Sequence, residues 1–439
     1  MLKVLANRTY RHLFFAQVIA LLGTGLATVA LGLLAYELAG ASAGAVLGTA
    51  LAIKMLAYIG IAPIASAFAE RLPRRALLVT LDLVRAGVAL MLPFVNQVWQ
   101  IYVLIFVLQS ASAAFTPAFQ AAIPDVLPDE RDYTKALSLS RLAYDVENLV
   151  SPALAAALLT VVTYHSLFNG TVAGFLASAA LVVSVVLPRA KLPPRRSIYE
   201  RTTRGVRIYF STPRLRGLLA LNLAIAAGSA MVIVNTVVLV QSTLGLEQKF
   251  TALALAAFGA GSMIVAIALP RILERLPERR VMLAGATVIA CALLTGSALL
   301  PSFTLLLVLW LIVGMGYSLA QTPSGRLLRR SSSPQDRPAL YAAQFALSHA
   351  CWLLTYPIAG WLGATAGLKV SFLALGVIAA AAIALASWLW PRVDPTARLH
   401  EHPDLDAGHP HLAEQRAHGD SHAHSHEFII DDLHTRWPS

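Results

Sequence analysis

The stretch Glu70-Arg71-Leu72-Pro73-Arg74-Arg75 occurs almost unchanged a second time, as Glu274-Arg275-Leu276-Pro277-Glu278-Arg279-Arg280, 204 residues further along the chain. Each copy lies in a short basic gap between two long apolar blocks. Two other proline-containing pairs recur at nearly the same distance: Thr116-Pro117 with Thr322-Pro323 after 206 residues, and Ser151-Pro152 with Tyr356-Pro357 after 205. Three matches in the same order at one offset indicate an internal duplication.

The composition around these stretches is that of a membrane protein. Of the 439 residues, 57% are hydrophobic and only 13% are charged, whereas a soluble domain carries about a quarter charged residues. A membrane-spanning helix takes roughly 20 apolar residues, and about twelve blocks satisfy that rule. They cover residues 12–38, 43–68, 76–96, 99–121, 136–162, 167–187, 217–241, 250–270, 281–300, 302–322, 341–364 and 367–390.

The predicted fold is therefore an all-α membrane protein of twelve transmembrane helices in two six-helix halves. The halves are residues 1–190 and 217–391, with a basic linker over 191–216 and a polar tail over 392–439. Paired halves of this kind are typical of secondary transporters, whose substrate site lies between them near the middle of the membrane.

The basic residues predict the orientation. Lys and Arg gather in every second connection and at both ends of the chain, whereas the alternate connections hold only Lys249 and Lys369. Because cytoplasmic loops carry the excess of Lys and Arg, both termini and the linker are expected in the cytoplasm. The excess of Lys and Arg in cytoplasmic loops also explains the net charge of +11, so we expect no nucleic-acid partner.

With these features, the chain resembles the major facilitator superfamily. The family pattern Gly-x-x-x-Asp-Arg-x-Gly-Arg-Arg between spans two and three corresponds here to residues 66–75, with the glycines replaced by Ser66 and Pro73. The resemblance implies a cytoplasmic gating cluster in each half. Its members would be Glu70, Arg71, Arg74 and Arg75 in the first half and Glu274, Arg275, Arg279 and Arg280 in the second. The segment 123–138 is similar to proton-coupled exporters that include macrolide and enterobactin efflux proteins.

The tail differs completely from the body. It contains nine of the twelve histidines, mostly spaced two residues apart: His400, His402, His409, His411, His418, His422, His424, His426 and His434. Alternate residues of an extended chain point the same way, and imidazole with occasional carboxylate suits Ni, Co, Cu and Zn. We expect a metal-binding tail without a fixed fold, although a solvated appendage is the simpler alternative. Taken with the body, the tail resembles that of bacterial nickel-resistance exporters, which implies Ni²⁺ as substrate and Co²⁺ as a second one.

Ionisable side chains inside a membrane are functional candidates by default. In span five, Arg141 and Asp145 share a helix face and are expected to form a structural ion pair. Glu147 has no cation nearby on its own helix, which makes it the better proton or metal carrier. His349 lies 204 residues after Asp145, so it occupies the equivalent depth in the second half; a buried histidine of the core is the alternative. Lys54 in span two is expected to pair with an acid of span five or to reach the membrane surface.

The leading hypothesis is a proton-driven exporter of Ni²⁺, with Co²⁺ second, in the bacterial inner membrane. One alternative is a drug or siderophore exporter with an incidental tail, and another is a membrane-anchored metal sensor or store. The sequence lacks a phosphate-binding loop and the common hydrolase motifs, so we expect no enzyme, no ATP and no resident cofactor. The expected partners are the lipid bilayer, protons and divalent metal ions, and the expected state is a monomer.

Overall fold

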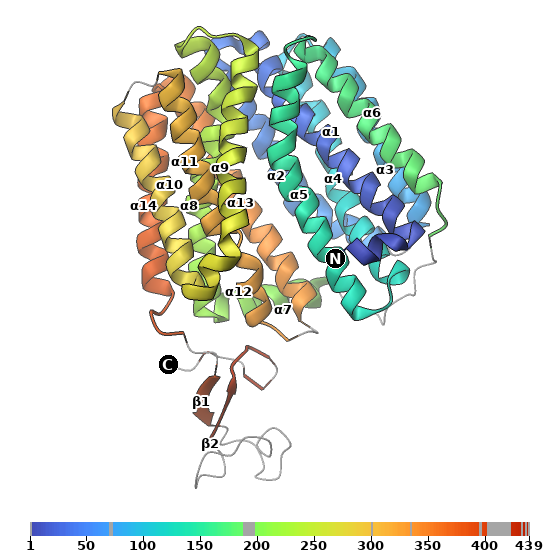
Figure 1. Ribbon diagram of the computed structural model, residues 1–439, viewed down its shortest axis with the longest axis vertical. Helices are drawn as coiled ribbons and strands as arrows, with labels where there is room; N and C mark the ends of the chain where they lie inside the picture. The colour runs from blue at the N-terminus through green and yellow to red at the C-terminus, as the bar shows by residue number, and fades with distance from the viewer. Residues whose placement is uncertain are drawn as a thin grey trace.

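The structure is a computed structural model of the chain. It describes residues 2–69, 73–187, 198–299, 302–333, 336–394, 397–401, 423–431, 433–434 and 437, and within some helices and both strands it describes the backbone alone. Among these residues, twelve helices of 18 residues or more form a bundle (Figure 1). This confirms the predicted all-α architecture.

The first half contains α1 (Arg8–Ala39), α2 (Ala43–Ala69), α3 (Arg74–Met91), α4 (Val98–Val126), α5 (Glu130–Leu158) and α6 (Tyr164–Val183). The second half contains α8 (Pro213–Val237), α9 (Gln248–Arg275), α10 (Glu278–Ala298), α11 (Phe303–Gln321), α13 (Arg337–Thr365) and α14 (Leu368–Leu389). Short elements are the helices α7 (Ile198–Ser211) and α12 (Ser324–Arg330), a π-helical turn (Val238–Thr243), and the strands β1 (Ala397–Glu401) and β2 (Ala423–Glu427).

The two halves repeat one packing plan. In the first half, α1 packs on α6, α2 on α4, and α3 on both α4 and α6; in the second, α8 packs on α14, α9 on α11, and α10 on both α11 and α14. The contacts between halves obey the same relationship, because α2 packs on α13 while α5 packs on α9. The duplication that three short sequence matches indicated therefore extends over both halves.

The outer surface of the bundle is apolar. Large side chains such as Phe94, Trp99, Ile267 and Trp388 are more than half exposed. Nine segments of the described chain are long and apolar enough to cross a membrane, the first taking in α1 together with most of α2. Because water does not favour such a surface, the bundle belongs in lipid, as an integral membrane protein with many passes.

Glycines allow α2 and α13 to approach closely across the boundary between the halves. A Cβ atom added to Gly360 would lie 2.1 Å from the carbonyl oxygen of Gly44, and one added to Gly48 would lie 2.5 Å from that of Tyr356. Only the missing side chains permit this separation. The contact lies at the end of the bundle away from the two chain termini, which both lie at the opposite end (Figure 1).

The basic linker contains a helix, α7, that lies between two of the predicted membrane spans. In α7, Ile208 and Tyr209 are buried against the second half, and the Tyr209 hydroxyl donates a hydrogen bond to Gln344 Oε1 over 2.5 Å. Burial raises the pKa of Tyr209 well above its usual value. Arg204 forms an ion pair with Asp336 at the start of α13, so the linker is attached to that helix.

The tail differs from the expected chain without a fixed fold. Strands β1 and β2 pair in antiparallel fashion beyond the end of the bundle (Figure 1). Phe428 and Ile430, which follow β2, are only 3% and 2% exposed and belong to the main hydrophobic core. Burial of these apolar side chains fixes a part of the tail that composition alone describes as polar.

Candidate functional site

Three polar side chains that the sequence placed inside the membrane lie near one another at the boundary between the halves. Lys54 belongs to α2, Glu147 to α5 and His349 to α13, and all three are partly buried. The ammonium group of Lys54 lies 5.6 Å from the ring centre of Tyr58, whose ring lies 5.3 Å from that of His349, and its charge interacts with that of Glu147. Together with Tyr58, which lies one turn after Lys54, we call these residues the boundary cluster.

The position of Glu147 depends on close packing between α5 and α1. A Cβ atom at Gly25 of α1 would lie 3.5 Å from Cγ of Glu147 and 2.2 Å from side-chain atoms of Ser151. The missing side chain at Gly25 therefore lets this face of α5 approach α1.

The ring of His349 is oriented by its own helix. Its Nδ1 atom lies 2.6 Å from the carbonyl oxygen of Phe345. Because a carbonyl oxygen only accepts, Nδ1 carries the hydrogen and Nε2 of the neutral ring keeps a lone pair. The ring contacts Phe345 at 4.0 Å and Tyr58 at 5.3 Å between centroids. His349 is thus available to bind a proton or a metal ion through one nitrogen.

A small cavity with a largely apolar lining and a few polar side chains adjoins Lys54 within the first half. It measures about 20 Å³, enough for a water molecule, and its polar lining comes from Lys54, Thr24, Thr28, Gln109 and Ser112. Gln109 is 7% exposed, and its Oε1 atom accepts no hydrogen bond from the described part of the chain. The cavity therefore places two polar side chains of α4, Gln109 and Ser112, beside Lys54 in otherwise apolar surroundings.

Two charged pairs of the first half lie outside the boundary cluster. The side chains of Arg141 and Asp145 lie outside the described residues, so the predicted ion pair in α5 stays a prediction. In α3, Arg85 forms an ion pair with Asp82, and both are buried. Ser178 of α6 donates to Asp82 over 2.7 Å, and the Arg85 guanidinium lies over the rings of Phe115 and Phe175. This pair stabilises the packing of the first half.

The predicted gating cluster of the first half is partly described. Glu70 and Arg71 lie outside the described residues. Arg74 forms an ion pair with Asp125 near the end of α4, and Arg75 donates a hydrogen bond to the carbonyl oxygen of Val183 at the end of α6. A cation at a helix C-terminus satisfies unpaired carbonyls and opposes the negative end of the helix dipole.

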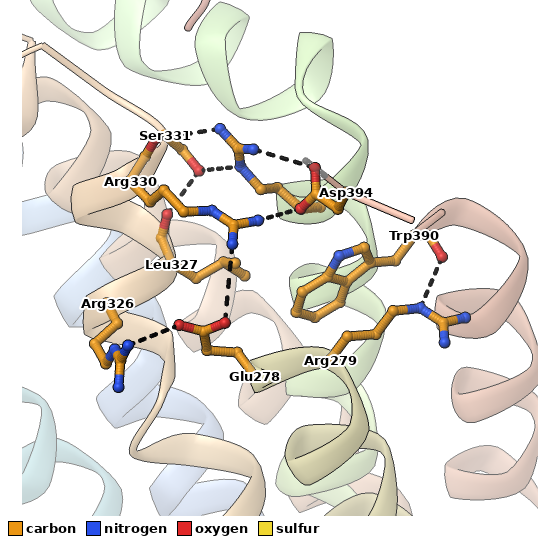
Figure 2. Close-up of polar contacts among 9 residues, drawn as sticks. Glu278, Arg279, Arg326, Leu327, Arg330, Ser331, Trp390 and Asp394 are labelled. Atoms are coloured by element: carbon orange, nitrogen blue, oxygen red, sulfur yellow. Dashed lines mark hydrogen bonds and ion pairs between the residues drawn. The ribbon is translucent and has the colours of Figure 1, made fainter. Parts of the chain in front are cut away.

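In the second half the predicted residues divide into two groups. Glu274, Arg275 and Arg280 are exposed. Arg279 donates to the carbonyl oxygen of Trp390 at 2.9 Å (Figure 2), and to that of Ser387 at 3.1 Å, where α14 ends. Arg279 therefore does for α14 what Arg75 does for α6, and the two arginines are 204 residues apart.

The ion pair between Arg74 and Asp125 has a counterpart in the second half, in which acid and base have exchanged places. At the start of α10, Glu278 interacts with Arg326 at 3.3 Å and with Arg330 at 3.8 Å, both on α12 (Figure 2). In the first half the base, Arg74, starts α3, and the acid, Asp125, lies near the end of α4. We did not predict Glu278 as a site residue, although its position, inserted between Pro277 and Arg279 in the second copy, is a visible signal.

The tail histidines are described only in part. His400 and His424 are register partners in the β1–β2 ladder, and His426 is the partner of Arg398. His434 contacts Asp431, with 2.9 Å between Nδ1 and Oδ1. The other predicted ligands lie outside the described residues: His402, His409, His411, His418 and His422. Within the described part of the chain, no group of three or more His, Cys, Asp or Glu residues could hold a metal ion.

Comparison with known proteins agrees with this architecture. The chain is 24% identical over 337 residues to the uncharacterized MFS-type transporter YfiS of Bacillus subtilis, covering 74% of this chain and 79% of that protein. It is 26% identical over 153 residues to macrolide efflux protein A of Streptococcus pyogenes, covering 32% of this chain and 38% of that protein.

A solved structure has the same fold. A bacterial homologue of the human lysosomal transporter Spinster, in an inward-facing and unoccupied conformation, superposes with a TM-score of 0.70 at 12% identity, covering 87% of this chain and 96% of that one. The Major Facilitator Superfamily matches residues 13–295 and 218–416. Because this match extends over both halves, the chain belongs to the Major Facilitator Superfamily and is a transporter, not an enzyme.

Proposed function

We propose that this transporter exports Ni²⁺, and Co²⁺ as a second cargo, from the cytoplasm in exchange for protons. It would act in the bacterial inner membrane as a monomer, with both termini in the cytoplasm and without ATP or a resident cofactor. The observation that carries the proposal is the boundary cluster, in which Glu147 and His349 come from opposite halves of the bundle to the surroundings of Lys54.

The cluster supplies groups that a divalent cation can use. Glu147 offers carboxylate oxygens and His349 offers the lone pair of Nε2, and both donor types bind Ni²⁺ and Co²⁺. Two protein ligands, with water for the other positions, hold an ion weakly, and weak binding allows a transported ion to leave.

Lys54 would allow a metal ion to enter and leave the site, because its ammonium group can replace the ion beside Glu147. Without cargo, its ammonium group balances the charge of Glu147. An arriving metal ion competes with that ammonium for the same carboxylate. Metal ligands must be deprotonated, so metal binding releases protons and protonation releases metal. Protons that enter from the outside would therefore expel the metal ion there.

The tail would act before the membrane site. Its histidines would bind metal ions in the cytoplasm and raise their concentration next to the bundle. The register pairing of His400 with His424 supports this role, because opposite positions of an antiparallel ladder are close in space.

Transport in inside-out membrane vesicles tests the proposal. We expect uptake of ⁶³Ni²⁺ that depends on an acid interior and is abolished by an uncoupler. Glu147→Gln and His349→Ala should each lower the initial rate by tenfold to a hundredfold, on the order of what metal-site changes cost. Matched controls are Glu247→Gln and His165→Ala, which lie at the ends of helices outside the cluster. Normal uptake in both cluster variants would exclude the proposed site.

A second candidate function is export of an organic compound. Aromatic rings surround His349, with Tyr58 and Phe345 in contact and Trp352 at 6.4 Å, and such rings also suit an apolar cargo. The similarity to macrolide efflux protein A supports the same candidate. Resistance assays separate the two, since an organic exporter protects cells from macrolides and leaves their nickel content unchanged. Deletion of residues 400–439 tests a sensor or store, which would lose all function without the tail.

A further inference from the structure

A buried asparagine lies where the two halves meet at the end of the bundle away from the chain termini, which we call the distal end. Asn235 belongs to the last turn of α8 and is 0% exposed. Directly after α8, the π-helical turn Val238–Thr243 packs on the 3₁₀ turn Gly40–Ser42, which joins α1 to α2 in the first half. Asn235 is therefore at a boundary that changes when the halves separate.

The amide nitrogen of Asn235 is bonded within the second half. Nδ2 donates to the carbonyl oxygen of Ala359 on α13 over 2.9 Å. The hydroxyl of Ser371 on α14 donates to the same carbonyl oxygen, also over 2.9 Å. Because a carbonyl oxygen only accepts, the amide must face it with its nitrogen. The amide oxygen of Asn235 therefore points elsewhere.

That oxygen lies between two glycines, one from each half. A Cβ atom added to Gly44 of α2 would lie 2.7 Å from Oδ1 of Asn235, and one added to Gly363 of α13 would lie 2.8 Å from it. Oδ1 is buried and accepts no hydrogen bond from the part of the chain that the structure describes. A glycine offers such an oxygen its Cα–H groups, which are weak donors. The first half thus covers an acceptor that no N–H or O–H group of the described residues satisfies.

An unsatisfied acceptor is costly only while it is kept from water. In the structure, Gly44 forms the wall of the first half over Oδ1. When the halves part at the distal end, as alternating access requires, that wall moves away and water can bond to Oδ1. The desolvation of one buried polar group corresponds to roughly fivefold to 150-fold in an equilibrium constant. This cost is present in the closed state and absent in the open one, so it favours opening.

We propose that Asn235 is a gating residue of the distal end, whose unsatisfied amide oxygen destabilises the closed state. The close contact between Gly44 and Gly360 stabilises closure of the same end, and a transporter must populate both states to complete its cycle. The oxygen of Asn235 offsets part of that stabilisation. This role concerns the conformational cycle, so it is the same for a metal ion and for an organic cargo.

The test uses full-length protein in lipid nanodiscs, with spin labels at Ser42 and Ala366, and measures the fraction that is open at the distal end. Asn235→Thr should lower that fraction by about fivefold to 150-fold. The threonine hydroxyl can donate to the carbonyl oxygen four residues earlier in its own helix, as that of Ser229 does. The threonine side chain also ends one atom short of Oδ1, so it leaves the glycine contacts unchanged.

Asn235→Asp separates the gating role from a structural one. Both substitutions remove the hydrogen bond from Nδ2 to Ala359, so a merely structural role would shift the open fraction in the same direction in both. Aspartate keeps an oxygen at the position of Oδ1, and at about pH 7 a carboxyl group in water is ionised. Because water reaches the carboxylate in the open state, Asn235→Asp should raise the open fraction.

Ser229→Ala is the matched control, because Ser229 is a buried polar residue of the same helix whose hydroxyl already donates to Ile225; the open fraction should not change. Asn235→Ser has the same expected direction as Asn235→Thr and replaces it if that variant does not fold. An open fraction that falls in the order Asn235→Asp, wild type, Asn235→Thr supports the proposal. Equal fractions in the three proteins, or a shift of both variants in one direction, would overturn it.

Discussion

The indole N–H of Trp361 on α13 donates a hydrogen bond to Oγ1 of Thr49 on α2 over 3.0 Å, and so joins the two halves at the end of the bundle away from the chain termini. Gly44, five residues before Thr49 on α2, and Gly360, next to Trp361 on α13, bring the two backbones together. A transporter of this fold works by moving one half against the other, so this contact must break whenever that end opens.

A side chain at Gly360 should therefore change the balance between the two transport states. Its Cβ atom would lie 2.1 Å from the carbonyl oxygen of Gly44, and relief of such a clash costs about 1–3 kcal/mol. We expect Gly360→Ala to populate a state that is open at this end. Spin labels at Ser42 and Ala366 should show a longer distance. Gly60→Ala is the matched control, since nothing lies within 4 Å of a Cβ there; an unchanged distance in Gly360→Ala would contradict the prediction.

The effects of substituting Lys54 and Glu147 on the free energy of unfolding should depend on each other. Removal of the ammonium in Lys54→Met leaves a partly buried carboxylate without its cation, so the free energy of unfolding should fall. Glu147→Gln in addition removes the unbalanced charge and should restore stability without restoring transport. We expect a coupling energy of about 0.5–3 kcal/mol between the two changes, typical of interacting groups. Unfolding of the two single variants and the double variant in detergent measures it, and strictly additive effects would refute the interaction.

The Arg74–Asp125 pair of the first half and the Glu278–Arg330 pair of the second half carry their charges in opposite order. We therefore predict that transport requires an ion pair at this position but not a particular order of acid and base. Arg74→Asp or Asp125→Arg alone should each lower transport, because an ion-paired hydrogen bond contributes about 1.5–3 kcal/mol. The double exchange rebuilds the pair in the orientation that Glu278 and Arg330 already use in the second half. We expect it to regain most of the lost activity in the vesicle assay. A double variant no better than the single ones would mean that this position requires a base.

Acid should weaken the turn that Asp431 forms after β2, where its carboxylate accepts hydrogen bonds from Leu433 and His434. Burial alone would raise the pKa of Asp431, but the hydrogen bonds from His434 and Leu433 outweigh it and lower the pKa to about 2. A carboxylate with a depressed pKa contributes stability above its ordinary value, near 4, and loses it as pH falls through the lower one. The ¹⁹F signal of 5-fluorotryptophan, assigned with Trp437→Phe, should therefore shift as pH falls from about 4 to about 2. In Asp431→Asn this shift should be absent, and its persistence would exclude Asp431 as the cause.

Much of the candidate site could be predicted, because an ionisable side chain inside a membrane costs free energy. Lys54, Glu147 and His349 stand out in apolar helices, where a charged side chain is retained only with a role or a partner. The 204-residue offset then placed His349 at the depth of span five. The sequence offered an acid of span five as one possible partner of Lys54. It could not predict which acid, nor that His349 lies nearby as well, since sequence order does not state which faces of α2, α5 and α13 meet.

The sequence predicts twelve membrane helices and their grouping into two related halves, because hydropathy, charge and an internal repeat are properties of local sequence. Tertiary structure alone decided that Glu278 pairs with Arg330, that Asp394 and Trp437 meet at Arg214, and that part of the histidine-rich tail is folded. These contacts join residues 52, 180 and 223 positions apart. Their formation depends on how packed helices bring distant segments together, and burial of Phe428 and Ile430 against the bundle supplies the free energy that no local pattern of the tail reveals.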